Sequence, residues 1–443
     1  MRIQLSEHFT YKKLIRFVIP SIVMMIFTSI YGVVDGLFVS NFVGKRAFAS
    51  INLMMPFIMG ISALGFMIGT GGSAIVGKTL GEGKHKKANE YFSLLVYTTA
   101  ILGVLISVLA ELFVPQVAEL LGAEGELLQN SILYGRLILI SMPAFMLQNI
   151  FQSFFVTAEK PKLGLAVMIS AGVTNMVLDF LLIGVWHFGL AGAAIATVCG
   201  EMIGGLFPVI YFARKNSSLL KLGKTKLEWR ILAQTCINGS SELMSNLSSS
   251  IVNSIYNMQL MKFAGEDGVA AYGTIMYVNF VFLAIFIGYA MGSAPIFSYH
   301  FGSQNHVELK NMFQKSLKLI GACGVFMVVV SQFLAIPFSR IFVGYDADLL
   351  RLTQNGFRIF CVVYLINGFN IFGSSFFTAL NNGLVSALIS FLRTLVFQIS
   401  AVLILPLLLG LNGIWWAITA AEILTGAVTV FFFITKRKQY HYI

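Results

Sequence analysis

Long apolar segments alternate with short polar ones along almost the whole chain. Runs such as Ile15–Ser40 and Leu384–Leu409 are long enough to cross a hydrocarbon layer of about 30 Å as helices that rise about 1.5 Å per residue. Twelve such segments can be placed, with approximate bounds 13–40, 49–77, 91–113, 131–157, 163–186, 190–212, 231–260, 269–297, 315–338, 353–380, 385–409 and 412–435. The pattern therefore predicts an all-α integral membrane protein with twelve transmembrane helices.

The composition supports this interpretation. Of the 443 residues, 57% are hydrophobic and only 11% are charged, whereas soluble proteins carry about 25% charged residues. The first apolar segment is too long for a signal-peptide core and is not followed by a small-residue cleavage site, so we expect it to be retained as a helix. The four cysteines form no CxxC pattern, and we expect inert, small hydrophobic side chains rather than disulfides or metal ligands.

The net charge of +11 would suggest a nucleic-acid partner in a soluble protein, but its distribution follows the positive-inside rule. Of the 30 Lys and Arg residues, 22 lie in segments that would share one side of a membrane, while the intervening loops hold many of the acids. We therefore expect a multi-pass protein of the cell membrane with both termini cytoplasmic, the lipid bilayer around it and no nucleic acid bound. The absence of nucleotide-binding, HExxH and GxSxG motifs argues against an enzyme, and we expect no cofactor.

The chain also carries a weak internal repeat. A shift of 221 positions aligns Gly44 with Gly265 and Gly71 with Gly292. The same shift aligns a distant block in which Glu201 falls on Glu422. We therefore divide the chain into an N-lobe (1–212), a basic cytoplasmic linker (213–230) and a C-lobe (231–443). Because each lobe has six helices, the repeats are parallel and pseudo-symmetric about an axis along the membrane normal.

Carboxylates inside the predicted spans are the main candidates for chemistry. Each costs about 2.5–3.5 kcal/mol at the centre of a bilayer, so such residues usually face a bundle interior or an aqueous cavity and have a function. Away from the span ends the chain has five of them: Asp35, Asp179, Glu201, Glu242 and Glu422.

One polar group is confined to the first half. Asp35 lies late in the first helix, downstream of a helix-bending Pro20, and Asn175 and Asp179 share one face of the fifth helix at i and i+4. Thr197 of the sixth helix could add a hydroxyl. Two carboxylates, an amide and a hydroxyl suit Na⁺, and paired carboxylates also suit a proton carrier. The alternative is a hydrogen-bond network that only fixes helix packing. The equivalent positions in the second half are Tyr256, Val396, Ser400 and Ile418, and this asymmetry favours a function.

Other polar residues support weaker hypotheses. Glu242 could contact a cationic substrate or only a backbone group near a helix start. Glu201 and Glu422 occupy matched positions, which favours a structural role, and Arg393 is expected to pair with an acid that the sequence does not identify. Most methionines and phenylalanines should face lipid or pack between helices, but a few could line a cavity. The substrate-lining candidates are Met54, Tyr272, Met276 and Asn279.

Over nearly its whole length the chain resembles the multidrug and toxic compound extrusion (MATE) family, and within it the MepA-like bacterial branch. The resemblance is carried by Pro20, by Asp35, Asn175, Asp179 and Thr197, and by Gly-Leu-Ala-Gly-Ala-Ala-Ile-Ala-Thr at 189–197. It implies a V-shaped pair of six-helix bundles in which Pro20 bends the first helix and the four polar residues bind the coupling ion. Glu242 resembles a helix-seven glutamate that binds cation or substrate in the NorM branch. That branch also has an acid in helix ten, but residues 355–380 contain none, so we expect the coupling site in the N-lobe.

The resemblance implies a cation-coupled antiporter, driven by H⁺ or Na⁺, that exports small cationic amphipathic drugs and so contributes to antibiotic resistance. We expect it to act as a monomer. Flippases for lipid-linked saccharides share the architecture and are the first alternative. A channel or receptor without coupled transport is the second, although the repeat and the one-sided acid cluster argue against it.

Overall fold

The computed structural model describes residues 3–442, and within that range all regular structure is helical. The first half contains α1 (Tyr11–Phe38), η1 (Val39–Val43), α2 (Lys45–Gly81), α3 (His85–Leu120), α4 (Gly125–Thr157), α5 (Pro161–Asp179), η2 (Phe180–Val185) and α6 (Gly189–Ala213). The second half contains α7 (Trp229–Gly302), α8 (His306–Val343), α9 (Ala347–Phe360), η3 (Cys361–Val363), α10 (Tyr364–Ala379), α11 (Gly383–Phe391), η4 (Leu392–Gln398), α12 (Ile399–Leu409) and α13 (Leu411–Tyr440).

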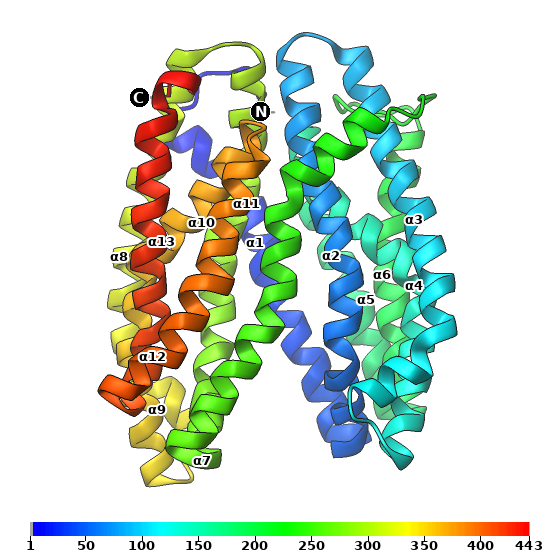
Figure 1. The fold of residues 1–443 in the computed structure, drawn as a ribbon. Coiled ribbons are helices and arrows are strands. Elements are labelled where there is room, and N and C mark those ends of the chain that lie inside the picture. The colour runs from blue at the N-terminus through cyan, green and yellow to red at the C-terminus, as the bar shows by residue number, and fades with distance from the viewer. Residues whose placement is uncertain (1–2, 443) are drawn as a thin grey trace.

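The described residues form eleven continuous apolar helical segments, and one of them is two membrane spans joined end to end. Helix α7 has 74 residues, which would extend about 110 Å at 1.5 Å per residue. Gly265 interrupts it with φ 62° and ψ −150°, a conformation in the left-handed half of the map that glycine adopts readily. The chain reverses there, as the lower end of α7 in Figure 1 shows. The spans 229–264 and 266–302 bring the total to twelve, and the predicted all-helical membrane fold is confirmed.

The helices are longer than the apolar segments from which they were predicted. The third segment, predicted at 91–113, is α3 from His85 to Leu120, and the predicted 315–338 is α8 from His306 to Val343. Hydropathy marks only the part of a helix that lies in hydrocarbon. The backbone hydrogen bonds continue into water until a cap stops them, as at Asn305, whose side chain accepts a hydrogen bond from the Glu308 N–H.

The helices form two bundles (Figure 1), an N-lobe that contains α2 to α6 and a C-lobe that contains α8 to α13. Helix α1 joins the two. Its first half packs in the core of the C-lobe through Leu14, Phe17 and Val18, whereas Phe27 and Tyr31 of its second half contact Gly172 of α5. Both termini lie at the same end of the molecule, here called the terminal end, and the two bundles diverge toward the opposite end.

At the terminal end the lobes meet through closely packed backbones. A Cβ at Gly71 of α2 would overlap the backbone of Thr235 and Gly239 in α7, and a Cβ at Gly239 would overlap the Met67 carbonyl. The Asn238 side chain lies in the same contact and donates a hydrogen bond of 3.2 Å to the Gly71 carbonyl. Because lipid offers no hydrophobic drive for helix association, small residues that permit such close contact are the main source of attraction.

The first residues of the chain bridge the lobes over the same end. Leu5 N–H donates to Glu159 Oε1 of the N-lobe at 2.8 Å, and Phe9 N–H donates to Glu308 Oε1 of the C-lobe at 2.9 Å. His8 Nδ1 lies 2.6 Å from Glu308 Oε2. Residues 3–10, here called the N-terminal strap, therefore connect the two lobes in the conformation described.

The segment between α6 and α7 is not helical and lies along α3. Lys221 N–H donates to Asn89 Oδ1 at 2.6 Å, and Gly223 N–H donates to Ser93 Oγ at 3.0 Å. This connection between the lobes is therefore held against the N-lobe.

The glycine contact leads to a testable prediction. Gly239→Val should prevent α2 and α7 from reaching their present separation, because the new side chain would overlap the Met67 carbonyl. We expect a lower melting temperature of the purified protein and weaker cross-linking between cysteines introduced on α2 and α7 at the terminal end. Gly273→Val is the matched control, since nothing lies within 4 Å of a Cβ there. Equal behaviour of the two variants would contradict the packing described.

Candidate functional site

The four N-lobe residues singled out from the sequence lie together. Asp35 of α1 and Asp179, the last residue of α5, interact directly through their carboxyl groups, and Asn175 is adjacent to Asp35. Asn175 Nδ2 lies 3.4 Å from Thr197 Oγ1 of α6. Close packing permits this convergence, because Gly200 of α6 lies against the Asn175 side chain and leaves no room for a Cβ.

This N-lobe cluster has an excess of hydrogen-bond acceptors. Asp179 is fully buried, and neither of its oxygens receives a hydrogen bond from any residue in the described range. The same holds for Asp35 Oδ1 and Asn175 Oδ1. Two ionised carboxylates in contact repel each other, and both lose their hydration. The arrangement is therefore stable only with a bound proton or a bound cation, and its oxygen ligands suit a hard cation such as Na⁺.

Three further side chains surround the acids and were not predicted. Tyr134 is buried within electrostatic range of both Asp35 and Asp179. Tyr31 precedes Asp35 by one helical turn and shares its face, a spacing that could have identified it. Gln148 lies beside Tyr31, and its buried Oε1, which faces Gly204 of α6, has no hydrogen-bond partner among the described residues.

Both acids lie where the regular helix changes. Asp179 is followed at once by the π-helical η2, and Asp35 lies one turn before the π-helical η1. Such segments are rare and occur often at functional sites, since the wider turn redirects side chains.

Pro20 lies within a continuous α1, next to Ser21, which contacts Gly288 and Gly292 of α7. A bend at Pro20 would therefore move Asp35 relative to the C-lobe.

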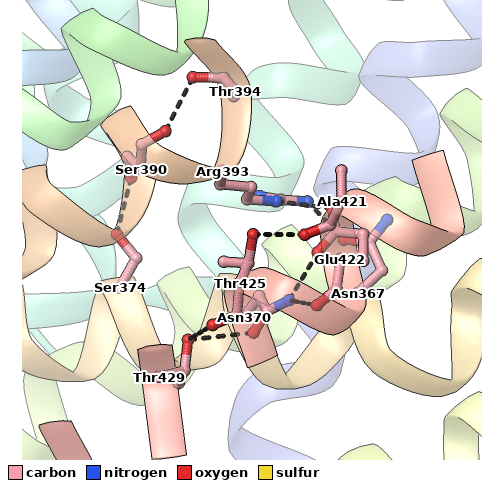
Figure 2. Close-up of polar contacts among 10 residues, drawn as sticks. All are labelled: Asn367, Asn370, Ser374, Ser390, Arg393, Thr394, Ala421, Glu422, Thr425 and Thr429. Carbon is pink, nitrogen blue, oxygen red and sulfur yellow. Dashed lines mark hydrogen bonds and ion pairs between the residues drawn. The ribbon is translucent and has the colours of Figure 1, made fainter. Parts of the chain in front are cut away.

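In the C-lobe, Arg393 pairs with Glu422, which answers a question that the sequence left open. Figure 2 shows the network. Arg393 Nε donates to Glu422 Oε1 at 2.7 Å, and Arg393 Nη2 donates to Asn367 Oδ1 at 2.6 Å. Asn370 Nδ2 donates to Glu422 Oε2 at 2.7 Å, and Thr429 Oγ1 donates to Asn370 Oδ1 at 3.0 Å. Glu422 is therefore held by an ion pair and an amide between three spans.

The matched residue Glu201 has different surroundings. Its Oε2 accepts a hydrogen bond of 2.5 Å from Ser141 Oγ, and no cation pairs with it among residues 3–442. At the 221-residue shift Arg393 corresponds to Gly172, where a Cβ would overlap Phe27 of α1. The space that Arg393 fills in the C-lobe is filled in the N-lobe by α1 itself.

Glu242 lies on α7, half-buried. It is about three and a half turns beyond the first residue, Trp229, too far to cap that helix start. Within the described chain its carboxylate accepts no hydrogen bond and forms no ion pair.

The four substrate-lining candidates are divided between the lobes. Met54 is fully buried in the N-lobe core. The others lie on the second span of α7, where Tyr272 stacks on Tyr256 with ring centres 5.3 Å apart. Met276 is partly buried, and Asn279 is buried with its Oδ1 unpaired.

Comparisons with known proteins agree with this architecture. The MatE family model matches residues 20–181 and again 243–404, two segments offset by 223 residues, close to the shift found in the sequence. "Multidrug export protein MepA" of Staphylococcus haemolyticus is 24% identical over 98% of this chain and 95% of its own length. The Staphylococcus aureus (strain MRSA252) protein of the same name is 24% identical over 93% of this chain and 91% of its own length.

Solved structures show the same fold. One described as an "outward-facing conformation of a multidrug resistance MATE family transporter of the MOP superfamily" has a TM-score of 0.92 and 22% identity, and the alignment covers 98% of this chain and 97% of that one. A second, a MOP superfamily transporter from Pyrococcus furiosus whose binding pocket is described as having reverse polarity, has a TM-score of 0.88 and 22% identity, with coverage of 98% and 96%. The predicted pair of six-helix bundles is confirmed.

The Arg393–Glu422 pair leads to a stability prediction. Glu422→Ala should lower the stability by about 3 kcal/mol, near the lower end for loss of one partner from a buried pair, because 19% of the Arg393 side chain remains exposed. The double variant Arg393→Met with Glu422→Gln should lose much less, since it leaves no unpaired buried charge. Thermal unfolding in detergent measures both. A double variant that is no more stable than Glu422→Ala would show that the pair is not the relevant interaction.

Proposed function

The chain belongs to the MatE family of secondary transporters and is not an enzyme, and we propose that it is a cation-coupled antiporter that exports cationic amphipathic compounds by alternating access. The relatives named multidrug export proteins support the substrate class. We place the chain in the cell membrane with the terminal end toward the cytoplasm, because that end carries most of the Lys and Arg residues.

The observation that carries the proposal is the contact between Asp35 and Asp179. Four acceptor oxygens of this cluster receive no hydrogen bond from the described residues: both of Asp179, Oδ1 of Asp35 and Oδ1 of Asn175. A proton or Na⁺ that enters from outside neutralises this pair, and its release inside restores the repulsion. One charge that crosses 100 mV supplies about 2.3 kcal/mol, enough to shift a two-state equilibrium by more than tenfold.

The neutralised pair acts on the rest of the lobe through α1. Its two ends pack in different lobes, and Pro20 weakens it between them. Loss of the negative charge at Asp35 lets the second half of α1 move toward α5. This movement closes the part of the substrate-binding region that lies in the N-lobe, and the substrate is displaced. The lobes then separate at the terminal end, where the glycine contacts and the N-terminal strap hold them in the conformation described.

Glu242 is the residue that we assign to the cationic group of the substrate. It is half-buried, it receives no hydrogen bond within residues 3–442, and it lies on α7, whose terminal-end half packs against the N-lobe. A negative charge without a partner near the lobe interface attracts an organic cation.

Transport into inverted membrane vesicles tests the coupling. Accumulation of tetramethylrhodamine methyl ester is measured under an imposed proton gradient and, separately, under an imposed sodium gradient. Asp35→Asn and Asp179→Asn should each reduce accumulation at least tenfold, because either change removes the charge that the ion neutralises. Glu119→Gln, at an exposed acid, is the control and should transport normally.

Two outcomes would overturn the proposal. The first is Asp35→Asn that transports at the normal rate with unchanged ion dependence. The second is a wild-type protein that accumulates nothing under either gradient, which would favour a flippase for a lipid-linked saccharide.

A further inference from the structure

A groove of about 170 Å³ lies between α1, the second span of α7 and α8. Its two walls are formed by Ile15, Val18 and Ile22 of α1 and by Leu319, Ile320 and Cys323 of α8. The α7 side contributes one polar group, the Tyr289 hydroxyl, which donates a hydrogen bond of 2.7 Å to Ser316 Oγ and is therefore already used. Apolar cavities of about 150 Å³ take up hydrocarbon rather than water, so the groove suits an apolar occupant.

The groove borders surfaces that contact lipid. Ile15 on its edge is 39% exposed, and Ile19 and Val23 continue an exposed apolar face along α1. On the opposite wall, Val325 and Phe326 of α8 are exposed as well. Exposed apolar faces of membrane helices are covered by acyl chains, because hydrocarbon surrounds them. An acyl chain therefore has direct access to the groove.

A positive charge marks the terminal end of the groove. Lys315 Nζ donates to the Phe9 carbonyl at 2.6 Å and lies 5.4 Å from the ring centre of Tyr11. Lys315 is one helical turn from Leu319, and Tyr11 is one turn from Ile15, so this contact joins the two walls just beyond the apolar part. A lysine ammonium has three N–H donors, and in the described chain Lys315 uses one.

More positive charge lies beside it without a counter-charge. Lys12 and Arg16, one turn apart on α1, are both exposed, and neither pairs with a carboxylate within residues 3–442. Glu7, the nearest acid in the sequence, is held by Lys13 at 2.6 Å. On α8 no acid follows Glu308. The terminal end of the groove therefore attracts an anion.

We propose that this groove binds an anionic phospholipid, with one acyl chain against Val18 and Ile22 and the phosphate group at Lys12, Arg16 and Lys315. Apolar walls that end in unpaired cations match the two parts of such a lipid, and basic pockets between transmembrane helices bind anionic headgroups. A lipid shell without a specific site would not distinguish headgroups. Binding at this position is an equilibrium property and does not depend on which ion drives transport.

The position of the chain gives the lipid a mechanical consequence. Val18 and Ile22 are two residues to either side of Pro20, the position at which α1 is weakest. A chain in the groove contacts α1 on both sides of the proline and so stabilises the continuous helix that is described here.

Native mass spectrometry of the purified protein in detergent tests the site. Dioleoyl phosphatidylglycerol and dioleoyl phosphatidylcholine have the same chains and differ in headgroup charge, and the ratio of their affinities is measured on the folded protein. Lys12→Gln/Arg16→Gln removes two of the cations. The matched control is Arg437→Gln/Lys438→Gln, which removes two exposed cations of α13.

A second pair of variants tests the apolar part of the groove. Cys323→Phe places a ring in the groove, and Val325→Phe places the same ring at an exposed position of the same helix. Ile15→Trp obstructs the groove from its exposed edge and replaces Cys323→Phe if that variant does not fold.

We expect the wild-type protein to prefer phosphatidylglycerol by about tenfold or more, and Lys12→Gln/Arg16→Gln to lose most of this preference. Cys323→Phe or Ile15→Trp should weaken the binding of phosphatidylglycerol by a similar factor, whereas both controls should stay within about twofold of wild type. Equal affinities of the two lipids for the wild-type protein overturn the inference. A preference that survives both the charge removal and the obstruction overturns it as well, because the anionic lipid then binds elsewhere.

Discussion

An ionised carboxylate inside a membrane needs a counter-charge, and the way each acid obtains one organises this molecule. Glu422 has a permanent partner, because the Arg393 guanidinium is part of the same chain. Among the described residues, Glu201 has only the hydroxyl of Ser141 as a partner. Both oxygens of Asp179 and Oδ1 of Asp35 have no hydrogen-bond donor among the described residues, and no cationic side chain there pairs with either acid, so we expect their counter-charge to come from solution. The Arg393–Glu422 pair carries no net charge, whereas the net charge of the Asp35–Asp179 pair would change with ion binding.

This division of roles arises within a repeated fold. The lobes share their helix order and the positions of Glu201 and Glu422, and one of the positions at which they differ has Gly172 in the N-lobe and Arg393 in the C-lobe. At Gly172 the α1 side chains Phe27 and Tyr31 approach the α5 backbone, which brings Asp35 near Asp179. At Arg393 a long side chain occupies the corresponding space. This position therefore distinguishes the lobe that packs the second half of α1 from the lobe that carries its own cation.

Much of this could be predicted from the sequence. Hydropathy placed all twelve spans, and the structure joins two of them into α7 through the turn at Gly265. Asn175 and Asp179 were found together because a helix places i and i+4 on one face. The partner of Arg393 could not be found this way, because Glu422 lies on another span and the contact depends on how η4 rotates the side chain. The N-terminal strap was also missed, since a short polar terminus has no periodic pattern and its contacts to Glu159 and Glu308 are far apart in sequence.

The proposed antiport requires that the contacts that hold the terminal end closed are weak enough for ion binding to reverse them. Helices in lipid gain no hydrophobic free energy by associating with one another, so the lobes are held there by van der Waals packing at glycines and by a few hydrogen bonds, each worth about 1 kcal/mol net. The transfer of one charge across a typical membrane potential supplies about 2.3 kcal/mol, which is of the same order. A larger interface would stabilise one conformation by more free energy than ion binding can supply. A smaller interface would let the lobes separate without a bound ion. In that proposal, the close packing at Gly71 and Gly239 and the few hydrogen bonds of the N-terminal strap keep both conformations accessible to a single ion-binding event.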